Sequence, residues 1–166
     1  GFYISGSINA NGSDINYIQI HRNRIENRIY FENSSYYNCN YWTIRNNILY
    51  EIWSNSLNPS LTNSNFENNI ITGRIYQFSS ASCIFTNNCF RRYSQTTDYF
   101  FGNLTYCQFI NNIFFGGNLS GVSNATFTNN IFYGYNGSNI DCSINGFARN
   151  IVDTDPLYVD GGSIYS

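Results

Sequence analysis

One short phrase recurs seven times along the chain and restricts the fold more than any other feature. It is an apolar residue, any residue, usually Asn, always Asn, usually Ile and an apolar residue, as in residues 109–114. The copies start at residues 20, 44, 66, 85, 109, 127 and 147, so successive starts lie 24, 22, 19, 24, 18 and 20 residues apart. A recurring unit of this length indicates a solenoid, in which each unit buries its apolar face against its neighbours.

The length and residue types of the unit favour a coil of short β-strands. Helical repeats need about 33–47 residues, and no stretch of the chain has apolar residues at 3.6-residue intervals. Leucine-rich repeats have a similar length, but their Leu-rich pattern is missing. Short β-type segments between Asn, Gly and Ser fit a solenoid with three brief strands per turn. We therefore predict one all-β domain over residues 1–166, a right-handed parallel β-helix of about seven rungs.

The two Asn positions of the phrase have different predicted roles. Asn adopts a left-handed backbone more readily than other non-Gly residues, so the phrase fits a tight bend. The third position is Arg22 and Arg149 in the first and last copies and Asn in the others, which indicates a residue that faces solvent. The fourth position is Asn in every copy, and amides stacked about 4.8 Å apart can hydrogen-bond along the coil. The predicted ladder contains Asn23, Asn47, Asn69, Asn88, Asn112, Asn130 and Asn150.

The other positions of the phrase predict an interior and an outer face. The first position is Ile in two copies and Phe in five, and the sixth is always apolar, so both are expected to point into the coil. The fifth should point outward because it follows the alternation of a strand. It reads Arg24, Ile48, Ile70, Cys89, Ile113, Ile131 and Ile151. Two interpretations stay open: the bend turns these side chains partly inward or under a loop, or they form an external apolar stripe that packs on another protein.

The composition supports a folded chain and excludes two classes of partner. With 15 Tyr and 14 Phe, the chain has enough apolar surface to fold, although it also holds 29 Asn. Charged residues make up only 11% and the net charge is −2, which gives no electrostatic footprint for nucleic acid. No apolar run approaches the roughly 20 residues that a membrane span needs. The start lacks Met and a signal-like segment, which indicates a processed product or an excerpt.

The Asn-containing coils resemble the right-handed parallel β-helix superfamily, which has the pectin-lyase-like fold. The segment Asp153–Asp160 is similar to a D-P-L-F-V-D phrase that often ends such domains in bacterial secreted proteins. Residues 153–166 are therefore expected to cap the last coil. Gly1-Phe2-Tyr3 resembles the exit of a rung, so the chain is expected to begin within one. The superfamily contains lyases, hydrolases and adhesins, so the resemblance implies a fold and leaves the function open.

The acidic residues do not form the pattern that the resemblance associates with catalysis. Lyases of the superfamily bind calcium through acidic residues, and related hydrolases use Asp residues on neighbouring rungs. Carboxylates at equivalent offsets in adjacent coils are needed for either site. Asp14 shares an offset with Asp141, and Glu26 with Asp153, but each pair spans opposite ends of the predicted coil. We predict no catalytic residues, no metal site and no cofactor, and leave enzymatic activity as a disfavoured alternative.

Two further groups of residues are candidates for chemistry or packing. Tyr36, Tyr37, Tyr41 and Trp42 gather in the second coil, where they either stack on a glycan or pack a long loop onto the body. Cys83 and Cys107 each lie two residues before the Phe of consecutive copies, so they are expected to be neighbours on the inner face. A disulfide and a pair of stacked thiols both remain open there.

Taken together, these features predict a non-enzymatic structural or adhesive module of a secreted, cell-surface or filament-forming protein. Its expected location is extracellular or at the cell surface. Its candidate partners are another copy or another protein, held through the coil ends or the apolar stripe, and a glycan. One alternative is a polysaccharide lyase or glycoside hydrolase of the pectin-lyase-like fold. Another is a glycan-binding adhesin.

Overall fold

The computed structural model contains only β-strands as regular elements in the part of the chain that it describes. The described residues are 1–10, 15–31, 39–54, 61–73, 75–76, 80–91, 99–101, 104–115, 118–119, 122–133 and 146–152. The predicted capping segment, residues 153–166, lies outside them. These described ranges include no helix with the length and apolar character needed to cross a membrane.

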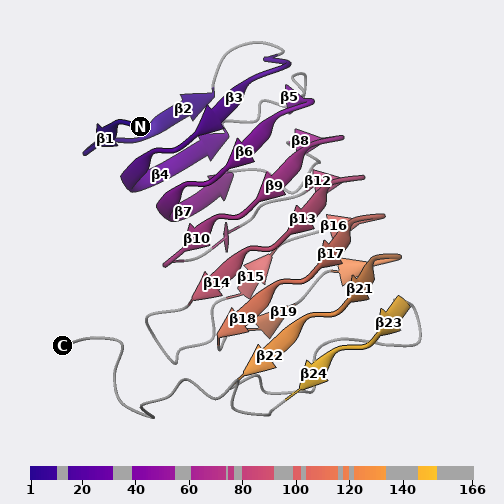
Figure 1. Ribbon diagram of the computed structural model, residues 1–166. Coiled ribbons are helices and arrows are strands. Elements are labelled where there is room, and N and C mark those ends of the chain that lie inside the picture. The colour runs from indigo at the N-terminus through magenta and orange to yellow at the C-terminus, as the bar shows by residue number, and fades with distance from the viewer. Residues whose placement is uncertain are drawn as a thin grey trace, which may run out of the picture.

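The strands form three long sheets and one short one (Figure 1). Sheet A has ten strands: β1 (Tyr3–Ile4), β2 (Ile8–Ala10), β4 (Arg24–Phe31), β7 (Ile48–Ser54), β10 (Ile70–Ile71), β11 (Ile75–Tyr76), β14 (Cys89–Arg91), β18 (Ile113–Phe115), β22 (Ile131–Tyr133) and β24 (Ile151–Val152). Sheet B has five: β5 (Cys39–Asn40), β8 (Leu61–Thr62), β12 (Ser80–Ala81), β16 (Leu104–Thr105) and β20 (Val122–Ser123).

Sheet C contains the starts of all seven phrases. Its strands are β3 (Gln19–His21), β6 (Thr43–Arg45), β9 (Asn65–Glu67), β13 (Ile84–Thr86), β17 (Gln108–Ile110), β21 (Thr126–Thr128) and β23 (Gly146–Ala148). The short sheet pairs β15 (Tyr99–Phe101) with β19 (Asn118–Leu119). Each successive strand in Figure 1 lies beside the strand one repeat earlier, which is the arrangement of a solenoid.

The strands are paired in parallel, and the register matches the sequence repeat. In sheet C, Phe85 aligns with Phe66 on one side and with Phe109 on the other. The fifth and sixth positions align in the same way in sheet A, where Cys89 lies opposite Ile70 and Ile113. The chain is thus an all-β parallel solenoid, and the part in which all three long sheets take part makes about four turns. The predicted parallel solenoid is confirmed.

The first and sixth positions of the phrase form the core, as predicted. Their described side chains are buried: Ile20, Ile44, Phe66, Phe85, Phe109 and Phe127 from sheet C, and Ile25, Leu49, Ile71, Phe90, Phe114 and Phe132 from sheet A. The rings stack along the coil, with centroids of Phe85 and Phe109 4.7 Å apart and planes inclined by 5°. Because the ring separation equals the strand spacing, each Phe covers the face of the next and the interior is continuous.

The bend between sheets C and A is made by the third position of the phrase. All seven residues there have a left-handed backbone with φ between 53° and 60°: Arg22, Asn46, Asn68, Asn87, Asn111, Asn129 and Arg149. They are exposed, as the sequence indicated. The sequence left open which Asn makes the bend, and the structure gives that role to the third position and the hydrogen-bond ladder to the fourth. Asn tolerates this conformation because its short polar side chain can hydrogen-bond locally, whereas Arg gains no such relief.

Arg22→Asn is therefore expected to raise the free energy of unfolding by about 0.5–1 kcal/mol, because the backbone conformation costs less for Asn. Urea denaturation of the two proteins measures the difference. The matched control is Arg45→Asn, since Arg45 is an exposed arginine in the strand β6, where extended backbone favours no such exchange. A variant at position 22 no more stable than the original chain would contradict the assignment of this bend.

Candidate functional site

The fourth-position Asn side chains hydrogen-bond to one another along the interior edge of the coil. At Asn88, Oδ1 accepts bonds from the backbone N–H and Nδ2 of Asn69, both at 3.0 Å. Its Nδ2 donates to the carbonyl of Phe66 at 2.9 Å and to Oδ1 of Asn112 at 3.1 Å. The buried members with bonds of this kind are Asn47, Asn69, Asn88, Asn112 and Asn130. These side chains use their polar atoms within the scaffold, so their role is structural.

The ladder continues to its partly buried end members. Oδ1 of Asn23 accepts the N–H of Phe2 at 3.1 Å, and the N–H of Asn23 donates to Oδ1 of Asn47 at 2.9 Å. At the other end, Nδ2 of Asn150 donates to the carbonyl of Phe127 at 2.9 Å. Each step thus joins the backbone of one turn to the side chain of the next.

The four residues proposed for glycan stacking do not share one surface. Tyr36 and Tyr37 lie outside the described residues. Trp42 is only 2% exposed, donates its indole Nε1–H to the carbonyl of Ile15 at 2.8 Å and packs edge-on against Phe31. Tyr41, the preceding residue, is 50% exposed. Trp42 therefore belongs to the core, and Tyr41 alone of the two described residues is presented to a ligand.

Tyr41 belongs to a second row of left-handed residues, at the bend between sheets B and C. Its members lie three residues before each phrase: Tyr17, Tyr41, Asn63, Ser82, Tyr106 and Asn124, with φ between 50° and 62°. We call this set the tyrosine row. Backbone bonds link its successive steps, as where the N–H of Tyr41 donates to the carbonyl of Thr62 at 3.2 Å. No repeated residue type in the sequence marks this row, although its regular offset from the phrase is a signal that could have revealed it.

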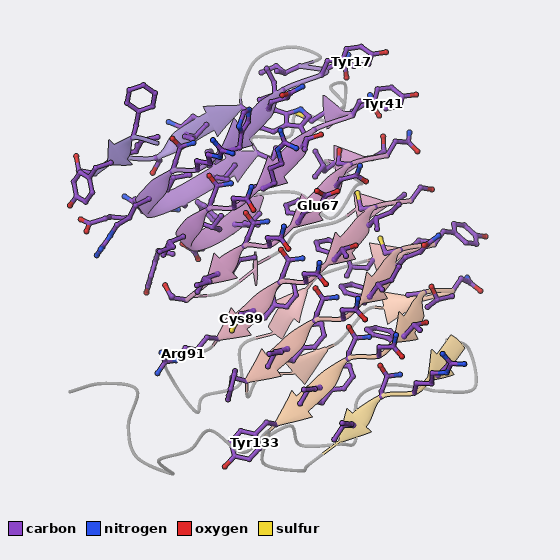
Figure 2. The ribbon with its side chains drawn as sticks, viewed as in Figure 1. Tyr17, Tyr41, Glu67, Cys89, Arg91 and Tyr133 are labelled. Atoms are coloured by element: carbon purple, nitrogen blue, oxygen red, sulfur yellow. The ribbon has the colours of Figure 1, made fainter. Side chains whose placement is uncertain are left out.

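Three members of the tyrosine row expose large aromatic rings. Tyr17 is 74% and Tyr106 is 65% exposed. The rings of Tyr17 and Tyr41 stack with centroids 5.0 Å apart and planes inclined by 9°. Figure 2 shows both side chains projecting from the body at the same corner, remote from the edge that carries Arg91 and Tyr133. This corner is the candidate binding surface of the described structure.

The outer face of sheet A carries the fifth-position residues in an external apolar stripe. Ile48, Ile70 and Ile151 are exposed, whereas Cys89, Ile113 and Ile131 are half-buried. Exposed tyrosines at the seventh position, Tyr50 and Tyr133, widen this face. Each of the two interpretations left open by the sequence agrees with part of the row: the exposed ends fit an external stripe, and the half-buried middle fits side chains turned partly inward or covered.

The cysteines of the described residues form no disulfide with one another. Cys83 and Cys107 are buried neighbours on the inner face, one strand apart, as the sequence predicted. Each lies near backbone carbonyls, with Sγ of Cys83 3.6 Å from the carbonyl oxygen of Ala81 and Sγ of Cys107 3.6 Å from that of Thr105. The stacked-thiol alternative is therefore the one present.

Cys89 is expected to react slowly with iodoacetamide in the folded chain. Burial raises the pKa of its thiol, and the positive charge of Arg91 opposes that shift only in part. A raised pKa leaves less thiolate, so alkylation near pH 8.5 should be several-fold slower than in urea-unfolded chain. Because the pKa is higher in the folded chain, the unfolded chain loses this proton first. The free energy of unfolding therefore falls as the pH rises from the ordinary thiol pKa to the raised pKa of the folded chain. Peptide mapping by mass spectrometry gives the rate at each cysteine, and equal rates for Cys89 in folded and unfolded chains would contradict the prediction.

The described acidic residues lie on three different strands, β4, β7 and β9. They are Glu26, Glu51 and Glu67, and the carboxylate of Glu26 lies 3.5 Å from the guanidinium of Arg24. Within the described ranges, no three His, Cys, Asp or Glu side chains gather as a candidate metal site. The other seven acidic residues lie outside those ranges: Asp14, Glu32, Asp98, Asp141, Asp153, Asp155 and Asp160.

Comparisons with known proteins identify no relative of the chain. No family model matches the chain. A search of curated proteins and a search of solved structures likewise give no match. The function must therefore be argued from the chain's own residues.

Proposed function

We propose that the chain is a non-enzymatic structural and adhesive module of an extracellular or cell-surface protein. The support is the contrast between the fourth position, which repeats the same chemistry at every step, and the outward second position, which does not. The fourth position is Asn throughout, whereas the outward second position reads His21, Arg45, Glu67, Thr86, Ile110, Thr128 and Ala148. The sequence thus repeats the residues that hold the coil together, whereas the outward second position carries no repeated group that could serve as a catalytic row.

The finer description of the fold belongs to the same proposal. We propose a right-handed β-helix of about seven rungs, similar to the pectin-lyase-like superfamily. Seven phrases align in one sheet, which supports the number. The hand follows from the strong preference of parallel crossover connections for a right-handed path. Such a body is stiff, because each turn is bonded to its neighbours by backbone hydrogen bonds, the Asn ladder and stacked rings.

Immunogold electron microscopy of the cells that produce the chain tests the proposed location. Antibodies against the folded chain are expected to label the cell surface or material outside the cells. Label confined to the cytoplasm would contradict the proposal. Permeabilised and intact cells examined side by side supply the control, since a surface module is labelled in both.

A polysaccharide lyase or glycoside hydrolase is the second candidate, because the seven undescribed acidic residues include Asp98 and Asp141. Incubation with neutral and acidic polysaccharides, followed by assays for reducing ends and unsaturated sugars, decides between the two. The structural proposal expects neither product. Turnover that Asp98→Ala abolishes would instead support the enzyme.

A further inference from the structure

The tyrosine row keeps bulky residues in a backbone conformation that favours other residues. Tyr17, Tyr41 and Tyr106 have φ of 62°, 60° and 56°, a region where large side chains are uncommon. Asn63 and Asn124 occupy the same row with φ of 50° and 52°, so the bend itself accepts Asn. The coil therefore does not need tyrosine at these positions. Residues held in strained backbone conformations cluster at functional sites, so these tyrosines are candidates for a functional role.

Burial does not compensate for the strain of these tyrosines. At least half of each side chain is exposed, with 74% for Tyr17, 50% for Tyr41 and 65% for Tyr106. Tyr17 and Tyr41 cover one another in part, since their rings lie face to face at 5.0 Å. This separation is close to the strand spacing, so the ring faces look along the coil axis. The row thus presents flat apolar faces at the surface.

Tyr106 is separated from Tyr41 by two members of the row that carry short polar side chains. Asn63 and Ser82 occupy these steps, and Asn124 follows Tyr106. Three strand spacings place the aromatic positions about 14 Å apart along the coil. No aromatic residue of the row adjoins either face of Tyr106, so both faces lie beside small residues that can hydrogen-bond.

The two rows that directly flank this interval carry no formal charge. The row that follows it reads Thr43, Asn65, Ile84 and Gln108, and the row that precedes it reads Asn40, Thr62, Ala81 and Thr105. Hydroxyl and amide groups next to an aromatic face suit a ligand with an apolar ring face and a polar, uncharged edge. Among biological polymers, an uncharged saccharide has this combination, because its C–H face stacks on aromatic rings while its hydroxyls donate and accept hydrogen bonds.

We infer that the tyrosine row binds an uncharged saccharide, with sugar rings stacked on Tyr106 and Tyr41 and hydroxyls bonded to Asn63 and Ser82. The inference deepens the adhesive part of the proposed function and rests on it. Of the four residues first considered for glycan stacking, it keeps Tyr41, and it adds Tyr17 and Tyr106. Trp42 stays in the core.

Isothermal titration of the intact chain tests the inference, with oligosaccharides of cellulose, chitin, mannan and xylan as uncharged probes and oligogalacturonate as the charged probe. We expect at least one uncharged probe to bind, and Tyr106→Asn to weaken that binding at least fivefold. Tyr41→Asn should act in the same direction. The control is Tyr133→Thr, which removes an exposed tyrosine from sheet A and should leave the affinity unchanged.

Thermal unfolding of the same variants separates lost binding from lost structure. Because Asn already occupies this bend at Asn63 and Asn124, Tyr106→Asn is expected to keep or raise the melting temperature. Three results would overturn the inference: no uncharged probe binds, the charged probe alone binds, or binding survives in the Tyr41→Asn, Tyr106→Asn double variant. Each would leave surface labelling by immunogold intact, whereas cytoplasmic labelling would reject the proposed function whatever the titration shows.

Discussion

Asn88→Ala is expected to lower the free energy of unfolding by about 3–5 kcal/mol, because it removes four buried hydrogen bonds of one side chain at once. The backbone N–H of Asn69 loses its acceptor. Nδ2 of Asn69 loses one of its two acceptors and keeps the carbonyl of Ile44. The carbonyl of Phe66 loses the donor that lies 2.9 Å away. The N–H of Asn69 that loses its acceptor costs about 1–3 kcal/mol, and each of the other lost bonds costs about 0.5–1.5 kcal/mol. Since water cannot reach the interior of the coil, these costs are not recovered by solvation.

Asn87→Ala is the matched control for the ladder variant. The two residues are neighbours of the same type, but Asn87 is exposed with φ of 55° and makes the bend. Its replacement should cost about 1 kcal/mol, the difference between Asn and Ala in a left-handed conformation. Urea denaturation of both variants under the same conditions gives the comparison. Equal losses for Asn87→Ala and Asn88→Ala would show that the fourth position has no special role.

The repeating part of the fold could be predicted from the sequence because its physical requirements are the same at every turn. The interior of a parallel coil admits large apolar side chains at fixed offsets, and Phe85, Phe109 and Phe127 meet that requirement. The fourth position is Asn in each copy because its amide must both donate and accept along the axis, which few side chains can do. Periodicity alone therefore identified the core and the ladder.

The second bend was missed because its residues differ from turn to turn. Tyr17, Asn63 and Ser82 share a backbone conformation but no side-chain chemistry. A bend exposed to solvent fixes φ and ψ and leaves the side chain free to vary, so no residue type repeats there. The position could have been found from register alone, three residues before each phrase.

The burial of Trp42, one of the two alternatives that the sequence left open for the aromatic cluster, follows from its place in the repeat. Cys83 and Cys107 were predicted to face inward because they lie two residues before a first-position residue, and Trp42 stands at that same offset from Ile44. Aromatic composition does not distinguish Trp42 from Tyr41, whereas their offsets from the phrase do. In a coil with sharp bends, adjacent residues point to opposite sides, so position in the repeat outweighs proximity in the sequence.

The strained tyrosines and the buried ladder are expected to contribute very differently to the free energy of unfolding. Replacing Tyr106 by Asn should cost the fold nothing, whereas replacing Asn88 should cost a large part of a typical domain's 5–15 kcal/mol. Residues whose removal leaves or improves stability are the ones whose presence calls for a functional explanation. By that criterion we propose the tyrosine row, and not the ladder, as the ligand-binding surface.

Phe109→Ala is expected to cost about 3–5 kcal/mol, the usual range for a fully buried Phe. The ring of Phe109 stacks between Phe85 and Phe127, each at 4.7 Å and inclined by 5°, and meets Phe114 at 6.0 Å. The cavity left by this ring exposes one face of Phe85 and one face of Phe127. The backbone hydrogen bonds between neighbouring turns hold the strands apart, so the coil cannot collapse into the cavity.

Phe66→Ala separates the stacking contribution from burial. Phe66 is equally buried, and its ring stacks on Phe85 at 4.6 Å, whereas the aligned residue of the preceding turn is Ile44. One stacked pair contributes about 0.5–1.5 kcal/mol beyond the buried area, so Phe109→Ala should be the more destabilising variant by roughly that amount. Urea denaturation of both, and of the exposed control Tyr133→Ala, measures the difference, and the control should change by less than about 1 kcal/mol. Equal losses at positions 66 and 109 would mean that the rings stabilise the coil by filling it, and that their stacking along the axis adds nothing.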